Sequence, residues 1–216
     1  VLRWTSSPNP PFGGYGPSFV NPRTGQILGA DIMLEYVFIT NRIKQENLYG
    51  IRGEAMEPNL NFETEAHGCN LGSHLHKNTL FGTTALNVLG KADVDITKYI
   101  EESLYYLILH EMGHTLGLMH NMKASQLWSP AEINNATVTK QVGLTGSVMD
   151  YPASNIAADP AKQGQYFTAS PGPYDMWVIE YGYSSSVEDA KAERDRLNKI
   201  LARSTEPQLT FGNDAD

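Results

Sequence analysis

The sequence predicts a mixed α/β (α+β) domain in which one clear strand is followed by several helices. The chain has 216 residues, of which 41% are hydrophobic, and this is enough for one domain with a real core. In residues 31–40 apolar side chains recur at every second position, as on one face of a strand, whereas residues 95–118 and 185–202 carry apolar residues at helical spacing. Because both patterns occur within one domain's length, we expect strands and helices to share a core.

The N-terminal part of the chain contains the predicted strand and several turn-rich segments. Glycine, proline, asparagine and serine dominate residues 1–30, and these residue types favour loops. Residues 31–40 (DIMLEYVFIT) predict a strand. The apolar face of this strand comprises Ile32, Leu34, Tyr36 and Phe38. We expect at most a short helix in residues 41–68, and one or two short strands in residues 68–90, where glycine and asparagine recur.

A long helix is predicted in the middle of the chain. Asp95 is a candidate N-cap for it, and Glu101 and Glu102 lie near its favourable N-terminal end. The apolar positions at helical spacing are Ile100, Leu104, Leu107, Ile108 and Leu118. Residues 121–146 then look like a long connection, with a short helix near residues 129–134.

Two further helices are predicted near the C-terminus. Residues 171–182 (PGPYDMWVIEYG) begin with proline and end with glycine, whereas residues 185–202 are charged and amphipathic. We interpret Asp175 and Trp177 as residues that anchor the first of these helices on the core. The ending, residues 210–216, is polar, and we expect it to be frayed.

Composition and charge exclude several classes of partner. The net charge is −8 and no lysine or arginine cluster occurs, so we expect no nucleic-acid partner. No apolar run approaches the roughly 18 residues of a membrane span. The single cysteine, Cys69, excludes an intrachain disulfide and a cysteine-rich zinc ribbon, and we interpret it as a small buried residue. The chain begins at Val1, and we expect it to be a piece of a longer precursor.

The stretch HEMGHTLGLMHN holds three of the six histidines of the chain. On a helix, His110 and His114 project from one face, so both imidazoles can reach a single point. Glu111 then lies beside them as a base for a water molecule. A continuing helix would carry His120 away, but Gly117 tolerates the left-handed backbone that ends a helix and can return His120 to the same point. Three imidazole nitrogens and a water form the catalytic arrangement for zinc.

These five positions match the metzincin signature H-E-x-x-H-x-x-G-x-x-H, and the chain resembles that family of zinc metallopeptidases more widely. The resemblance extends from about residue 21 to residue 183. Its segments are NPRTGQILGADIM, LGLMHNMKAS, SVMDYPASN and PGPYDMWVIEYGY, which are similar to a bacterial branch of large, exported, matrixin-related metallopeptidases. It implies a zincin-like catalytic domain, peptide-bond hydrolysis by a zinc endopeptidase, and an extracytoplasmic location (secreted, periplasmic or cell-surface) in a bacterium.

The segment SVMDYP matches the second half of the metzincin signature. The resemblance implies that Met149, 29 residues after His120, lies in a tight turn and forms an apolar floor beneath the three imidazoles. A thioether can pack there without competing strongly for zinc. In the astacin and serralysin branches a tyrosine two residues later reaches the zinc or the reacting oxyanion, and Tyr151 has that spacing. The alternative is that Tyr151 is a turn residue that hydrogen-bonds locally.

Two features depart from the family's pattern. Metzincins usually begin with a strand and a backing helix, and this sequence displays no such pair. Asn121 follows the third histidine, where the familiar branches carry other residues. We therefore expect a zincin-like catalytic domain in residues 1–183, lacking that strand and helix, followed by an amphipathic helix and a polar tail in residues 184–216.

Several alternatives remain open at this point. His74 and His76 would share one face of a strand and could form a second metal pair, although polar residues on an edge strand are the simpler interpretation; His67 has no partner nearby in the sequence. The chain could be a catalytically inactive peptide-binding relative, which the intact Glu111 argues against, or a zinc hydrolase of a non-peptide amide or ester. We favour a peptide or protein substrate that lies extended along an exposed strand edge.

Overall fold

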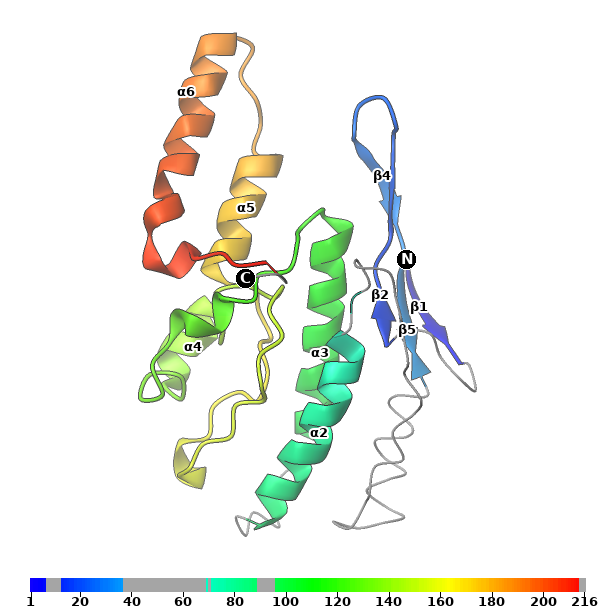
Figure 1. The fold of residues 1–216 in the computed structure, drawn as a ribbon, viewed down its shortest axis with the longest axis vertical. Helices are drawn as coiled ribbons and strands as arrows, with labels where there is room; N and C mark the ends of the chain where they lie inside the picture. The colour runs from blue at the N-terminus through cyan, green and yellow to red at the C-terminus, as the bar shows by residue number, and fades with distance from the viewer. Residues whose placement is uncertain (7–12, 37–68, 70, 89–95, 214–216) are drawn as a thin grey trace. The chain divides into compact units, whose positions relative to one another are not determined.

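The computed structural model of the chain consists of two compact units, Val1–Gly117 and Leu118–Asp216 (Figure 1). The described residues are 1–6, 13–36, 69, 71–88 and 96–213. Among them, strands occur in the first unit and helices in both, which confirms the mixed α/β fold class. The predicted domain boundary after residue 183 stays a prediction.

Five short strands in the described part of the first unit form two small sheets. They are β1 (Leu2–Thr5), β2 (Gly14–Tyr15), β3 (Ser18–Val20), β4 (Ile27–Ala30) and β5 (Ile32–Glu35). In the first sheet β5 is central, with β1 parallel on one side and β2 antiparallel on the other. In the second sheet β3 and β4 pair antiparallel.

The predicted strand in residues 31–40 is confirmed in its first part as β5. Its side chains Ile32 and Leu34 are buried, as the alternation predicts. The prediction of loops throughout residues 1–30 is wrong, because β1 to β4 lie there. β1 presents mainly exposed side chains and therefore has no buried face; its pairing with β5 makes it a strand. Residues 37–68, including His67, lie outside the described residues.

A helix, α2 (Leu71–Val88), occupies the region where short strands were expected. Its asparagine, glycine and threonine residues resemble turn formers, but tertiary packing of its apolar positions outweighs that preference. Leu71, Leu75 and Leu86 are buried, and the hydroxyl of Thr79 donates a hydrogen bond to the Leu75 carbonyl at 2.7 Å. The strand prediction here is therefore wrong.

The predicted central helix is confirmed as α3 (Ile96–Thr115), which packs on α2 and on strands β2 and β5. The buried Tyr99 hydroxyl donates to the Asn78 carbonyl at 3.0 Å. A Cβ at Gly82 would lie 2.1 Å from that hydroxyl oxygen, so only glycine allows the two helices to approach so closely. The candidate N-cap Asp95 lies outside the described residues.

The regular secondary structure of the second unit is helical in its described residues. Its elements are η2 (Ala124–Leu127), α4 (Ala136–Val142), η3 (Pro160–Lys162), α5 (Pro173–Tyr183), α6 (Ala190–Leu201), η4 (Ala202–Thr205) and η5 (Pro207–Leu209). Helices α5 and α6 confirm the two C-terminal predictions and lie side by side in Figure 1. None of the described helices is long and apolar enough to span a membrane.

Two expectations for the second unit are wrong. The short helix predicted near residues 129–134 lies instead at α4, because the Asn135 side chain accepts a hydrogen bond from the Thr137 amide and so caps a later start. The predicted frayed ending is ordered through residue 213: Leu209 is buried, and the backbone beyond it is hydrogen-bonded.

Candidate metal centre

Two histidines form the first part of the site, on one face of α3. His110 and His114 lie one turn apart, with ring centroids 4.8 Å from each other and ring planes 86° apart. His110 is fully buried, whereas His114 is half-buried. The two rings therefore point to one small region, as the spacing of four predicts.

Cys69 lies beside these two histidines. Its sulfur and one ring nitrogen from each of His110 and His114 all lie within 4.8 Å of one another. Imidazole nitrogen and cysteine sulfur are both donors that zinc accepts, so the residues of the first unit fit a zinc ion by their donor chemistry. Sequence reasoning interpreted Cys69 only as a small buried residue; it is half-buried and adjoins the candidate ligands.

Glu111 is fully buried beside this cluster. The Cys69 thiol donates a hydrogen bond to its Oε1 at 3.4 Å. Burial raises the pKa of Glu111 to about 7, while the hydrogen bonds from Cys69 and from the backbone N–H of Gly16 act in the opposite direction. A carboxyl group with a pKa near neutrality can both accept and release a proton, which suits a general base.

Two glycines of the segment around β2 make room for Glu111. A Cβ at Gly14 would lie 2.7 Å from Oε1 of Glu111, and a Cβ at Gly16 would lie 2.4 Å from its carbonyl oxygen. Sequence reasoning missed both glycines because it assigned the segment to a loop. The available signal was the run GGYG, since glycine in a strand often marks a close approach of another part of the chain.

Helix α3 ends where the sequence predicts. The Gly117 amide donates to the His114 carbonyl at 2.9 Å, and Gly117 has φ of +87°, in the region that favours glycine. The first unit ends at this residue, and His120 follows in the second unit. Leu118, which was predicted as an apolar position of the helix, is buried but lies beyond the helix end.

His120 and Tyr151 lie together in the second unit. The Tyr151 hydroxyl is 3.2 Å from Nε2 of His120, and the ring centroids are 5.0 Å apart. Both side chains are half-buried. The alternative that Tyr151 only bonds locally within its turn does not describe this contact, which reaches across 31 positions of the sequence.

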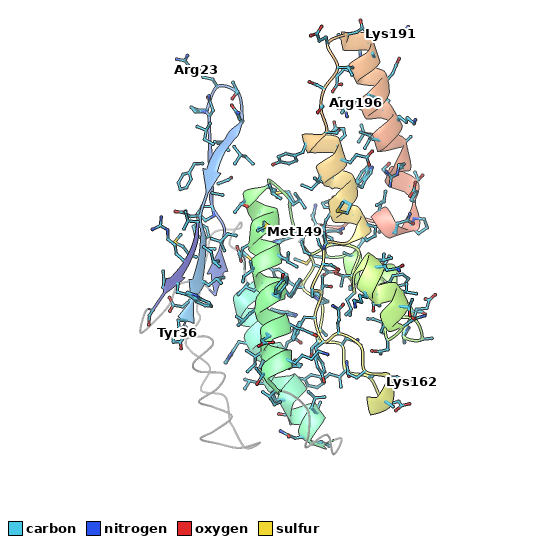
Figure 2. All side chains as sticks on the ribbon, turned by 180° about the vertical axis from the view of Figure 1, so that it is seen from behind. Arg23, Tyr36, Met149, Lys162, Lys191 and Arg196 are labelled. Atoms are coloured by element: carbon cyan, nitrogen blue, oxygen red, sulfur yellow. The ribbon has the colours of Figure 1, made fainter. Side chains whose placement is uncertain are left out.

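Met149 is fully buried in a tight turn (labelled in Figure 2). The buried carboxylate of Asp175, on α5, holds this turn: it accepts hydrogen bonds from the Ser147 hydroxyl at 2.5 Å and from the Val148 amide at 2.8 Å. It also accepts one from the Gly172 amide at 2.8 Å. The interpretation of Asp175 as an anchor of its helix is confirmed.

Trp177, the other residue interpreted as an anchor on the core, contacts the neighbouring helix. Its indole N–H donates to the Ile200 carbonyl at 2.8 Å and so ties α5 to α6. The possible pairing of His74 and His76 depended on a strand, and that premise is wrong: on helix α2, side chains two residues apart point in different directions.

Asn121 is a residue whose contacts sequence reasoning missed. It is fully buried, and its side chain bonds to residues 210 and 212 at the C-terminal end. The only signal in the sequence is that Asn121 directly follows the third histidine of the motif.

Comparison with known proteins places the motif in a family. The Met-zincin family model matches residues 92–216, which is more than half of the chain and includes α3, His120, Met149 and Tyr151. The comparisons with curated proteins and with solved structures gave no match. Zinc is the cofactor that this family implies, and the donor set around His110 fits it. The chain therefore belongs to the Met-zincin family and is a zinc metallopeptidase.

Proposed function

We propose that the protein is a zinc-dependent endopeptidase in which His110, His114 and His120 hold the metal. The observation that carries this proposal is the buried Glu111 carboxyl beside two adjacent imidazoles on α3, within the region that matches the family. The third ligand is proposed from the signature spacing after Gly117. When bound, zinc lowers the pKa of a coordinated water towards about 7 and polarises the scissile carbonyl.

Glu111 acts as the general base in this proposal. Its carboxylate takes a proton from the attacking water as the new carbon–oxygen bond forms, and it later delivers that proton to the leaving amine as the carbon–nitrogen bond breaks. The hydrogen bonds from Cys69 and Gly16 orient the carboxylate. Because Glu111 is enclosed by Gly14 and Gly16, it has little freedom to turn away.

Tyr151 acts as a hydrogen-bond donor to the oxyanion that develops on the scissile carbonyl. Its hydroxyl lies 3.2 Å from Nε2 of His120, which supports a place beside a ligand nitrogen. Met149 has a packing role without a metal bond. Its complete burial and the Asp175 hydrogen bonds that hold its turn support an apolar floor.

We further propose that substrate peptides bind extended along an exposed strand edge, and that the protein acts in an extracytoplasmic compartment of a bacterium. The first proposal follows from the way sheets recognise peptides through main-chain hydrogen bonds. The second follows from the sequence resemblance to exported metallopeptidases.

The test combines metal analysis with a peptide-library digest. We expect one zinc per chain, cleavage inside peptides, and loss of cleavage with a chelator that returns when zinc is added. An inactive binding relative would retain zinc and bind peptides without cleaving them. A hydrolase of non-peptide amides would cleave small amide or ester substrates and leave the peptide library intact.

A further inference from the structure

We propose that Asn121 is a positioning residue that uses the C-terminal tail, residues 210–212, to hold His120 in place for zinc. This inference rests on the proposed function, because it takes His120 to be a ligand. Asn121 directly follows His120 in the sequence. Every contact described below lies within the second unit.

The side chain of Asn121 is engaged at both ends of its amide group. It is fully buried, its Nδ2 donates to the Thr210 carbonyl at 2.9 Å, and its Oδ1 accepts from the Gly212 amide at 3.1 Å. The Lys123 amide also points to Oδ1, at 3.4 Å. A buried amide is tolerated when its donors and acceptors are satisfied, and this one is satisfied by the tail.

The backbone around Asn121 is held from two sides. The Asn121 amide donates to the Met149 carbonyl at 3.0 Å, and the next amide, that of Met122, donates to the Gly212 carbonyl at 2.7 Å. His120 is therefore followed by a residue that is bonded to the turn of Met149 and to the tail. A rotation of the chain at this point would break bonds on both sides, so the backbone that carries the His120 ring is fixed.

The tail and the residue before it pack against the rest of the second unit, so the tail can hold Asn121 in position. Leu209 is buried, and the ring of Phe211 stacks on Tyr174 of α5 with centroids 5.8 Å apart. A Cβ at Gly212 would lie 2.7 Å from Cδ of Lys123, so glycine permits the close approach. The family match includes both Asn121 and this tail.

Only an amide side chain satisfies both tail contacts. An aspartate would place a second oxygen against the Thr210 carbonyl, and an alanine would leave that carbonyl and the Gly212 amide unpaired. Residues that orient a metal ligand typically change metal affinity by 10- to 100-fold when they are replaced. We therefore expect replacement of Asn121 to lower the affinity for zinc as well as the stability of the fold.

The experiment measures zinc affinity by competition with a chelating dye, and the midpoint of thermal unfolding, Tm, of the zinc-free protein. Asn121→Ala should weaken zinc binding by about tenfold or more. The matched control is Asn155→Ala: this asparagine also holds a loop of the second unit, through Nδ2 bonds of 2.9 Å to the Gln165 carbonyl and to Oδ1 of Asn134. The control should lower Tm by a comparable amount while zinc affinity stays at the wild-type value.

A second variant ends the chain after Leu209 and so removes both partners of the Asn121 amide. It should weaken zinc binding to a similar degree, and adding Asn121→Ala to it should have little further effect, because the two changes break the same bonds. Wild-type zinc affinity in the truncated chain would overturn the inference even if Asn121→Ala does not fold. Equal loss of zinc affinity in Asn155→Ala would also overturn it, since destabilisation alone would then explain the effect.

His120→Ala separates this inference from the proposed function. If His120→Ala loses zinc affinity while Asn121→Ala and the truncated chain bind zinc normally, only the positioning role fails. If His120→Ala keeps wild-type zinc affinity, the three-histidine site of the proposed function fails, and the positioning role fails with it.

Discussion

The hydroxyl of Tyr151 lies 3.2 Å from Nε2 of His120, and the two rings meet at an angle of 65°. The residues are 31 positions apart, and the Asn121 amide donates a hydrogen bond to the Met149 carbonyl at 3.0 Å, which ties the turn before Tyr151 to the residue after His120. This arrangement places a hydroxyl group beside a proposed zinc ligand. A hydrogen-bond donor in such a position is suited to stabilise the negative charge that develops on the substrate oxygen during the reaction.

Tyr151→Phe tests this role. We expect the substitution to lower kcat by on the order of a hundredfold, with KM and zinc content nearly unchanged, because the lost hydrogen bond would be made mainly in the transition state. Steady-state kinetics and metal analysis of the purified variant would measure this. Normal turnover in the variant would leave Tyr151 as a residue that shapes its turn.

Glu111→Gln should leave zinc bound and remove most turnover. The amide keeps the size of the side chain but cannot take a proton from water, and loss of a general base typically costs about 10²- to 10⁴-fold in rate. Glu101→Gln is the matched control, since Glu101 is exposed on the same helix. Near-wild-type activity of Glu111→Gln, with the control also active, would exclude the general-base mechanism.

Gly14→Ala should disturb Glu111 without touching any proposed ligand. The new Cβ would lie 2.7 Å from Oε1 of Glu111, so the carboxylate must shift. We expect kcat to fall by up to about a hundredfold, as for other small displacements of catalytic groups, while zinc stays bound. Gly29→Ala is the control, because its Cβ would meet nothing closer than 3.9 Å. A similar fall in kcat in both variants would refute a specific effect on Glu111.

Met149→Leu should retain zinc and most activity. The exchange nearly conserves volume, and such core substitutions usually cost less than about 1.5 kcal/mol. Met149→Ala should destabilise the protein by about 2 to 5 kcal/mol, because the side chain is fully buried and its removal leaves a cavity. Denaturant unfolding and metal analysis of both variants distinguish packing from coordination; loss of zinc in Met149→Leu alone would point to coordination.

Asp175→Asn should reveal a pH-dependent contribution to stability. Burial raises the pKa of Asp175 above its ordinary value of 3.8, although its three hydrogen bonds act in the opposite direction. The folded state therefore binds this proton more tightly than the unfolded state, so the contribution is complete below pH 3.8 and is lost as the pH rises through the folded pKa. The free energy of unfolding of the wild type, relative to Asp175→Asn, should fall as the pH rises. Urea unfolding at a series of pH values measures the difference, and a rise with pH would contradict the expected sign.

The sequence alone predicted the features that depend on neighbours along one helix. The spacing of His110 and His114 on α3 places their ring centroids 4.8 Å apart, and Gly117 ends that helix with a positive φ. Helices α5 and α6 were recognisable for the same reason. In each case the signal is a helical period or a terminating residue, which acts over a few positions.

Only the tertiary structure decided the contacts between distant segments. Cys69 is hydrogen-bonded to Glu111, 42 positions away in the sequence, and Asn121 is hydrogen-bonded to Gly212, 91 positions away. Strand β1 is paired by β5 although its own side chains are mostly exposed, and α2 is a helix although its composition resembles a turn-rich segment. Packing against segments that are distant in the sequence selects these arrangements. A local pattern of residue types does not identify those distant segments.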